Sequence, residues 1–201
     1  MQIIDNFFTD PYKIRKEALD IKKWNCNYRY PGYRQDVSES LASKYLYQIR
    51  SILNEDVKVD DPRENIRFQF MDKSWGRGLV HFDKAKYTVL TFLTPSAPSN
   101  SGIEIYDERR GHHNLNWRGH KIDDFTREVK KGYYTSDRNP IRRFFFERKA
   151  RQLNSIFKNP CIISNVFNRT VIFEGQRVHR AQDYFGTKLH DSRLIMIGFL
   201  T

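Results

Sequence analysis

The tripeptide His81-Phe82-Asp83 places an imidazole and a carboxylate two positions apart. In an extended segment, side chains at positions i and i+2 project to the same side, so both groups can reach a single ion. Imidazole together with carboxylate suits a divalent transition metal such as Fe(II). Because an HxD tripeptide also occurs by chance, it indicates a metal site only if a distant segment supplies a third ligand.

His179 is the candidate for that third ligand. The segment before it, 168–175, is typical of a strand followed by a tight turn, and a return strand then begins at Val178. Two histidines and one carboxylate on one face of an ion leave positions open for a chelating co-substrate and O₂. We therefore predict that His81, Asp83 and His179 form a metal centre that is also the catalytic centre.

Arg193 begins the otherwise apolar segment 193–200. The apolar neighbours predict burial, and a buried guanidinium needs an anion because an unpaired charge is costly to desolvate. A ligand carboxylate could accept two parallel hydrogen bonds from it. An internal ion pair with Asp83 or Glu104 would also meet this need, and the residues alone leave both interpretations open.

The first third of the chain is predicted to contain two helices that support the rest. Asp10-Pro11 is a good helix start, because Asp can cap free amides and Pro fits the first turn. A second helix is expected from Ser38, and 30–33 reads as a turn between the two. Apolar residues recur at helical spacing behind each start, at Ile14, Ala18 and Ile21 and at Leu41, Tyr45, Ile49 and Ile52.

From Ile66 onward the apolar period changes to that of strands. Ile66, Phe68 and Phe70 alternate with more polar residues, which predicts a half-buried strand. Further strands are expected at 79–81, 87–94, 103–106, 161–167, 170–173, 178–182 and 193–200. Many short strands separated by Gly and Pro signals favour a mainly β fold with flanking helices, and a double-sheet jelly roll fits best.

The stretch 107–160 interrupts the strand pattern. It is charged, it contains His112, His113 and His120, and it includes an expected helix from Ile141 to Phe157. About 50 residues with few aliphatic side chains would make a poor core, so we interpret the stretch as one insertion within a single domain, 1–201. In this division 1–60 is helical support, and 66–106 and 161–201 form the jelly-roll core. Solvated loops are the expected setting for these histidines and for His190.

Composition narrows the class of protein. The chain has 201 residues, 39% of them hydrophobic, which is ordinary for a globular domain. The net charge of +11 permits a nucleic-acid partner, but the basic residues are spread along the chain. No apolar run or N-terminal pattern predicts a membrane span or a secretory signal. Cys26 and Cys161 are far apart and are expected to be reduced, so a cytoplasmic protein is predicted.

The order and spacing of these features resemble the 2-oxoglutarate/Fe(II)-dependent oxygenase superfamily, nearest its prolyl-4-hydroxylase-like branch. The resemblance covers about 66–106 and 161–200. It rests on the HxD tripeptide, the distal histidine, the arginine on the following strand, and two strands that resemble family strands, 87–94 and Gly-led 102–106. A double-stranded β-helix is the fold that this resemblance implies.

The resemblance also implies functions for individual residues. His81, Asp83 and His179 would bind Fe(II), and Arg193 would bind the far carboxylate of the co-substrate 2-oxoglutarate. Many relatives carry a tyrosine where this chain has Phe92, and that tyrosine helps to hold the same carboxylate. Tyr87, or the pair Ser164 and Asn165, could substitute, and we predict Tyr87 as a co-substrate contact.

The implied reaction is oxidation of a substrate C–H bond, normally hydroxylation, with conversion of 2-oxoglutarate and O₂ to succinate and CO₂. Amino acids, peptides and small molecules remain open as substrates. A nucleic-acid demethylase of the same superfamily is less favoured, because nothing basic follows Arg193 on its strand. A non-redox metal-binding jelly-roll module and a zinc hydrolase are further alternatives, although a hydrolase leaves Arg193 without a purpose. Oligomeric state is not predicted.

Overall fold

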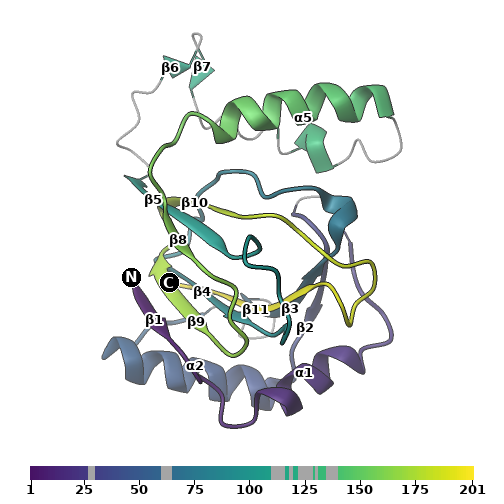
Figure 1. The fold of residues 1–201 in the computed structure, drawn as a ribbon. Coiled ribbons are helices and arrows are strands. Elements are labelled where there is room, and N and C mark those ends of the chain that lie inside the picture. The colour runs from purple at the N-terminus through teal and green to yellow at the C-terminus, as the bar shows by residue number, and fades with distance from the viewer. Residues whose placement is uncertain are drawn as a thin grey trace.

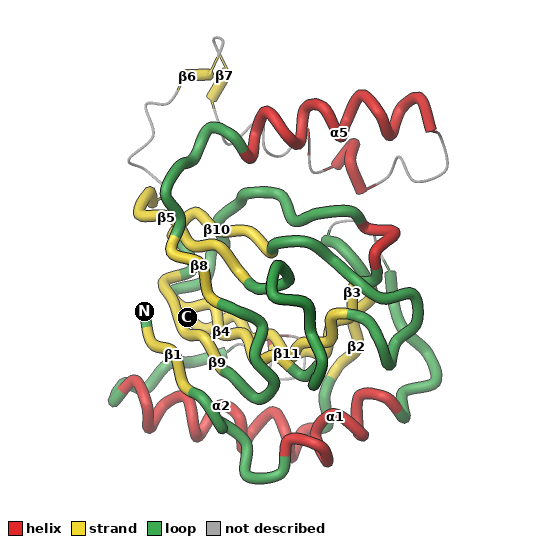
Figure 2. The backbone as a smooth tube through the Cα atoms, in the orientation of Figure 1, coloured by secondary structure: helices red, strands yellow, loops and turns green. Residues whose placement is uncertain are grey.

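Two antiparallel β-sheets face each other, with helices on the outer side of each (Figures 1 and 2). The computed structural model describes residues 1–26, 30–59, 65–109, 116–117, 120–121, 129, 131–134 and 140–201. The strands are β1 (Gln2–Ile4), β2 (Tyr33–Asp36), β3 (Ile66–Met71), β4 (Tyr87–Phe92), β5 (Ile103–Arg109), β6 (Asn116–Trp117), β7 (His120–Lys121), β8 (Cys161–Ile163), β9 (Thr170–Glu174), β10 (Arg177–Ala181) and β11 (Arg193–Leu200). The α-helices are α1 (Pro11–Leu19), α2 (Glu39–Leu53) and α5 (Pro140–Asn154).

Both N-terminal helices begin where their capping residues predict. The Asp10 carboxylate accepts a hydrogen bond from the Lys13 amide, and the Ser38 hydroxyl accepts one from the Leu41 amide. Each bond satisfies an amide that lacks a partner within the helix. The helix starts were therefore correctly predicted from local sequence.

The larger sheet has six strands among the described residues, in the order β1-β9-β4-β11-β3-β2. Helices α1 and α2 lie against its outer face (Figure 1). The sequence did not predict the short edge strands β1 and β2. The turn before β2 requires Gly32, whose φ is 77° and whose added Cβ would lie 2.0 Å from the Phe70 carbonyl oxygen.

The smaller sheet has the order β10-β5-β8. The predicted strand, tight turn and return strand are present as β9, the turn Gly175-Gln176 and β10, and the turn carries the chain from the larger sheet to the smaller one. The strand expected at 79–81 is reduced to one residue, since only His81 pairs with β10. The strand expected at 161–167 is shorter than predicted, because β8 ends at Ile163.

Two layers of apolar side chains fill the molecule. One lies between the larger sheet and the N-terminal helices and contains Tyr45, Val89 and Met196, whereas the other lies between the sheets. Because both faces of the larger sheet are covered, β3 is not half-buried as predicted. Gln69 is only 2% exposed, although it was expected on a solvent face.

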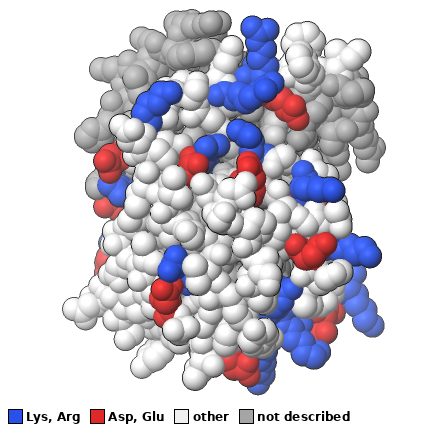
Figure 3. All heavy atoms as spheres, in the orientation of Figure 1, with Lys and Arg blue, Asp and Glu red and all other residues white. Residues whose placement is uncertain are grey.

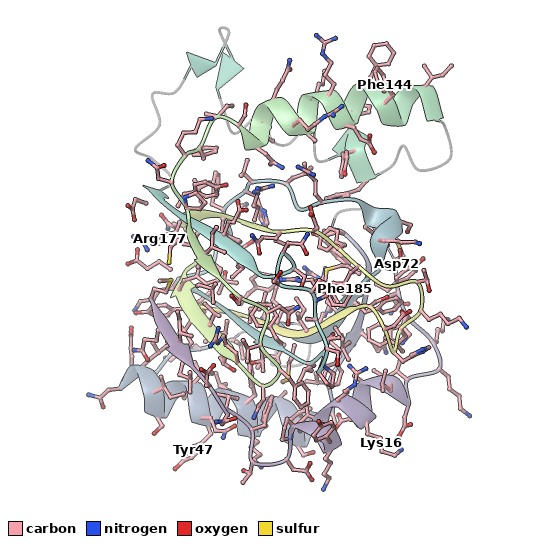
Figure 4. All side chains as sticks on the ribbon, viewed as in Figure 1. Lys16, Tyr47, Asp72, Phe144, Arg177 and Phe185 are labelled. Atoms are coloured by element: carbon pink, nitrogen blue, oxygen red, sulfur yellow. The ribbon has the colours of Figure 1, made fainter. Side chains whose placement is uncertain are left out.

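The insertion contributes side chains to the layer between the sheets. Tyr133, Leu153 and Phe157 belong to the same buried cluster as residues of β4 and β11. Helix α5 lies beyond the smaller sheet, and Phe144 on it points away from both sheets (Figures 1 and 4). The expected helix at 141–157 is therefore confirmed in position, with its end at Asn154.

A buried chain of hydroxyl groups joins α2 to the larger sheet. Tyr45 Oη lies 2.9 Å from Thr91 Oγ1, which lies 2.6 Å from Thr170 Oγ1. Replacing Tyr45 with Phe removes one buried hydrogen bond and keeps the ring, so we expect a loss of about 1 kcal/mol in the free energy of unfolding. Urea unfolding measures this loss. An unchanged unfolding midpoint would show that the hydroxyl contributes nothing to holding the helix.

Candidate metal centre and adjoining cavity

Backbone pairing brings the two predicted histidine ligands together. The His81 amide donates to the His179 carbonyl at 2.9 Å, and the His179 amide donates to the His81 carbonyl at 2.8 Å. Residues directly opposite each other in an antiparallel pair project side chains to the same face. The ring centroids are accordingly 4.4 Å apart.

Asp83 completes the set from the loop between His81 and β4. Its amide donates to the Gly175 carbonyl at 2.7 Å, which ties it to the β9–β10 turn. Asp83 Oδ1 lies 3.9 Å from His81 Nε2, and Oδ2 lies 3.3 Å from His179 Nε2. One potential ligand atom from each of the three residues lies within 4.8 Å of the others.

The second nitrogen of each imidazole is held by a backbone carbonyl. His81 Nδ1 lies 2.8 Å from the Leu79 carbonyl oxygen, and His179 Nδ1 lies 2.8 Å from the Arg177 carbonyl oxygen. A carbonyl only accepts, so these contacts select the tautomer with the proton on Nδ1. In this tautomer Nε2 carries the lone pair that can bind a metal, as is usual for metal-ligating histidines.

The Asp83 carboxyl group is held in its ionised form. Burial would raise its pKa, but the two histidines and the Thr88 hydroxyl favour the anion and lower the pKa below its usual range. Two imidazoles and one carboxylate on one face fit a divalent transition metal. The donor set therefore fits Fe(II).

Thr88 holds the Asp83 carboxylate in place by donating from Oγ1 to Oδ2 at 2.7 Å. Replacing Thr88 with Val keeps the shape and removes this hydrogen bond. We expect metal affinity to fall by roughly 10- to 100-fold, as is typical when a partner of a metal ligand is lost. Thr91→Val is the matched control, because Thr91 lies on the same strand and bonds Tyr45 and Thr170 instead. Calorimetry with Mn(II) measures both variants, and equal affinities would contradict the role of Thr88.

A cavity of about 190 Å³ adjoins the three candidate ligands and contains Arg193 in its wall. Along β11, Arg193, Ile195 and Ile197 line this cavity. The alternate residues Leu194 and Met196 pack toward the helices, as the two-residue period of a strand requires. The strand thus places one guanidinium at the cavity wall.

Arg193 has no carboxylate partner among the described residues. It is 1% exposed, and it donates from Nε to the Ser101 carbonyl at 3.0 Å and from Nη2 to the Gly102 carbonyl at 3.2 Å. The two candidate internal partners are engaged elsewhere, since Glu104 pairs with Arg180 and Asp83 lies against the histidines. Burial lowers the pKa of Arg193 to about 10, so the group remains charged at neutral pH.

The structure does not bring Tyr87 to the cavity. Residues of β4 alternate between faces, and Thr88 and Leu90 line the cavity while Tyr87 does not. The Tyr87 hydroxyl instead donates to Glu55 at 3.0 Å. Ser164 and Asn165 are also absent from the cavity wall among the described residues.

Tyr134, Tyr184 and Arg34 are among the cavity residues that were not predicted from the sequence. The two tyrosine hydroxyls are hydrogen-bonded to each other, and burial raises the pKa of both. The Arg193 charge acts on Tyr184 and lowers its pKa in part. A phenol therefore lies near Arg193, but it comes from the loop after β10 and not from β4.

The remaining histidines form no second cluster within the described part of the chain. The group of three described above is the one set of possible metal ligands there. His190 is exposed in a turn, as expected. His112 and His113 lie outside the described residues, and the side chain of His120 is not described.

No family model and no curated protein matches the sequence. Solved structures do match across nearly the whole chain. A prolyl hydroxylase from Trichoplax adhaerens, in complex with a peptide fragment of hypoxia inducible factor, has a TM-score of 0.58 and 13% identity over 99% of this chain and 82% of that chain. HygX from Streptomyces hygroscopicus with nickel and 2-oxoglutarate bound has a TM-score of 0.58 and 12% identity over 98% and 81%.

A Pseudomonas putida prolyl-4-hydroxylase matches with a TM-score of 0.50 and 12% identity over 99% of this chain and 90% of that chain. These likenesses show the fold, which is the double-stranded β-helix of 2-oxoglutarate oxygenases. The fold predicted from the strand pattern and the resemblance is therefore confirmed.

Proposed function

We propose that the protein is an Fe(II)- and 2-oxoglutarate-dependent dioxygenase that hydroxylates a C–H bond of an amino acid, a peptide or another small molecule. One observation carries the proposal. A complete His-Asp-His face and a buried arginine without a carboxylate partner among the described residues share one cavity. A set of three metal ligands alone is compatible with several reactions. The additional guanidinium favours a reaction with an anionic co-substrate, because it can bind a carboxylate.

Each residue has a distinct part in this proposal. His81, Asp83 and His179 bind the metal through Nε2 and carboxylate oxygen, while Arg193 binds the distal carboxylate of 2-oxoglutarate. Bound iron supplies the activation of O₂. Leu90, Phe173 and other apolar wall residues restrict water at the reacting atoms.

The similar structures support the proposal from outside the chain. HygX was solved with nickel and 2-oxoglutarate bound and also with iron bound. The same fold in this chain carries a ligand set suited to the same kind of metal.

Charge provides no comparable support for a nucleic-acid substrate. On the face drawn in Figure 3, Lys and Arg lie in separate groups, and several of them adjoin Asp or Glu. No helix among the described residues is long and apolar enough to cross a membrane.

The test is succinate formation from 2-oxoglutarate in air, followed by NMR, with Fe(II) present. We expect slow turnover without added substrate, which stops when iron is replaced by Zn(II). Binding of 2-oxoglutarate to Mn(II)-loaded protein is measured in parallel. If 2-oxoglutarate neither binds nor turns over, the proposed function is wrong.

A further inference from the structure

A second guanidinium, that of Arg34 on β2, lines the same cavity as the metal centre. The hydrogen bond from Arg34 Nε to Gln69 Oε1 is 3.0 Å long. Gln69 is itself fixed, because its Nε2 donates to the Pro31 carbonyl at 2.6 Å. The Arg34 guanidinium carbon also lies 3.8 Å from the centre of the Tyr30 ring. Gln69, Pro31 and Tyr30 thus set the position of one cation.

No carboxylate of the described residues lies within ion-pairing distance of Arg34. Asp83 is the one acid among the described lining residues of the cavity. Asp83 acts on Arg34 only at long range, because no ion pair joins them, and its carboxylate faces the histidines. Burial lowers the pKa of Arg34 to about 10, so it is charged at neutral pH. A half-buried cation that is held in place without an anion can bind one.

The charges of the loaded site indicate how much negative charge is missing. The inference rests on the proposed function. A divalent metal is offset by Asp83 and by the near carboxylate of 2-oxoglutarate, and Arg193 is offset by the far carboxylate. Arg34 then remains as one unbalanced positive charge among the described lining residues.

We propose that Arg34 binds a carboxylate of the substrate, so that the substrates are small carboxylic acids such as amino-acid derivatives. One carboxylate balances the remaining charge, whereas a phosphate brings about −1.5 to −2 at neutral pH. The planar fork of arginine matches a carboxylate in bidentate geometry. The cavity volume of about 190 Å³ is well below that of pockets for drug-sized ligands, which favours a small substrate.

The experiment compares acids with their neutral amides on protein loaded with Mn(II) and 2-oxoglutarate. A pool of N-acetyl amino acids and the matching pool of N-acetyl amino acid amides are screened by saturation-transfer NMR, with methyl phosphate as a third probe. The tightest-binding acid is then titrated by calorimetry. The proteins are wild type, Arg34→Gln, Arg34→Lys and the control Arg67→Gln. Arg67 lies on neighbouring β3, pairs with Asp36 and does not line the cavity.

We expect wild type to bind acids in preference to amides. Arg34→Gln should lower the affinity for the selected acid by roughly 10- to 100-fold, because a charge-assisted bidentate contact is lost. The affinity for the matching amide should not change. Arg34→Lys should restore part of the affinity, since an ammonium lacks the fork. Arg67→Gln should behave as wild type.

Three results would overturn the inference: equal binding of acids and amides by wild type, tighter binding of methyl phosphate than of any acid, or equal acid affinity in Arg34→Gln. The affinity for 2-oxoglutarate separates this inference from the proposed function. If Arg34→Gln lowers the affinity for 2-oxoglutarate as much as an Arg193 variant does, Arg34 belongs to the co-substrate site. The inference is then wrong, while the proposed function stands. If wild type binds no 2-oxoglutarate, the proposed function fails first.

Discussion

Replacing His179 with Ala is expected to abolish succinate formation and to weaken metal binding by more than about 100-fold, beyond the loss typical of a partner of a ligand. His179 is 4% exposed and faces both His81 and Asp83. The alanine variant leaves one imidazole and one carboxylate, too few to hold the metal on a three-ligand face. Calorimetry with Mn(II) measures the loss directly.

The control for this variant is His190→Ala. His190 is exposed in a turn and uses its backbone carbonyl, not its ring, to bind Arg15. That variant should bind Mn(II) as wild type does. If His179→Ala retains wild-type metal affinity while folded by circular dichroism, the metal centre is not the one we describe.

Replacing Arg193 with Ala is expected to lower the affinity for 2-oxoglutarate by roughly 10² to 10³. The variant leaves the distal carboxylate of the co-substrate buried without a partner, which costs about 3–5 kcal/mol. Metal affinity should change little, because Arg193 is not a ligand. The two variants should therefore fail in opposite ways, His179→Ala in metal binding and Arg193→Ala in co-substrate binding.

The measurement is titration of 2-oxoglutarate into Mn(II)-loaded protein. Arg193→Lys should recover part of the affinity, because an ammonium keeps the charge but not the two parallel bonds. Arg193 also donates to the Ser101 and Gly102 carbonyls, so thermal unfolding of each variant is compared with wild type. Equal 2-oxoglutarate affinity in all three proteins would show that Arg193 is structural, and the oxygenase proposal would lose its main support.

Local sequence determined the features of this protein that depend on near neighbours. The helix starts at Asp10 and Ser38 follow from capping within one turn of the chain, and the reversal from β9 to β10 follows from the tight turn at Gly175. The HxD pair and the distal histidine were recognisable because positions i and i+2 of an extended segment share one side and a later predicted strand supplies the third ligand type. The order of these motifs and of the predicted strands along the chain then indicated the fold.

Only the tertiary structure decided which face of a strand meets the cavity. Both faces of β4 are covered, so its hydrophobic pattern does not distinguish the helix side from the cavity side. Thr88 consequently holds Asp83, while Tyr87, predicted from the sequence as a co-substrate contact, binds Glu55. The same reason explains why buried Gln69 was expected at the surface.

The residues that line the cavity wall opposite these strands also could not be predicted from the sequence. Arg34, Tyr134 and Tyr184 come from an edge strand, the insertion and the loop after β10, and none of them belongs to a motif. Their convergence depends on how the two sheets close over each other and on the insertion packing into the layer between them. Residue spacing does not predict such contacts, because they join segments roughly 50 to 150 residues apart. The side chains of these segments interact only after the sheets have formed.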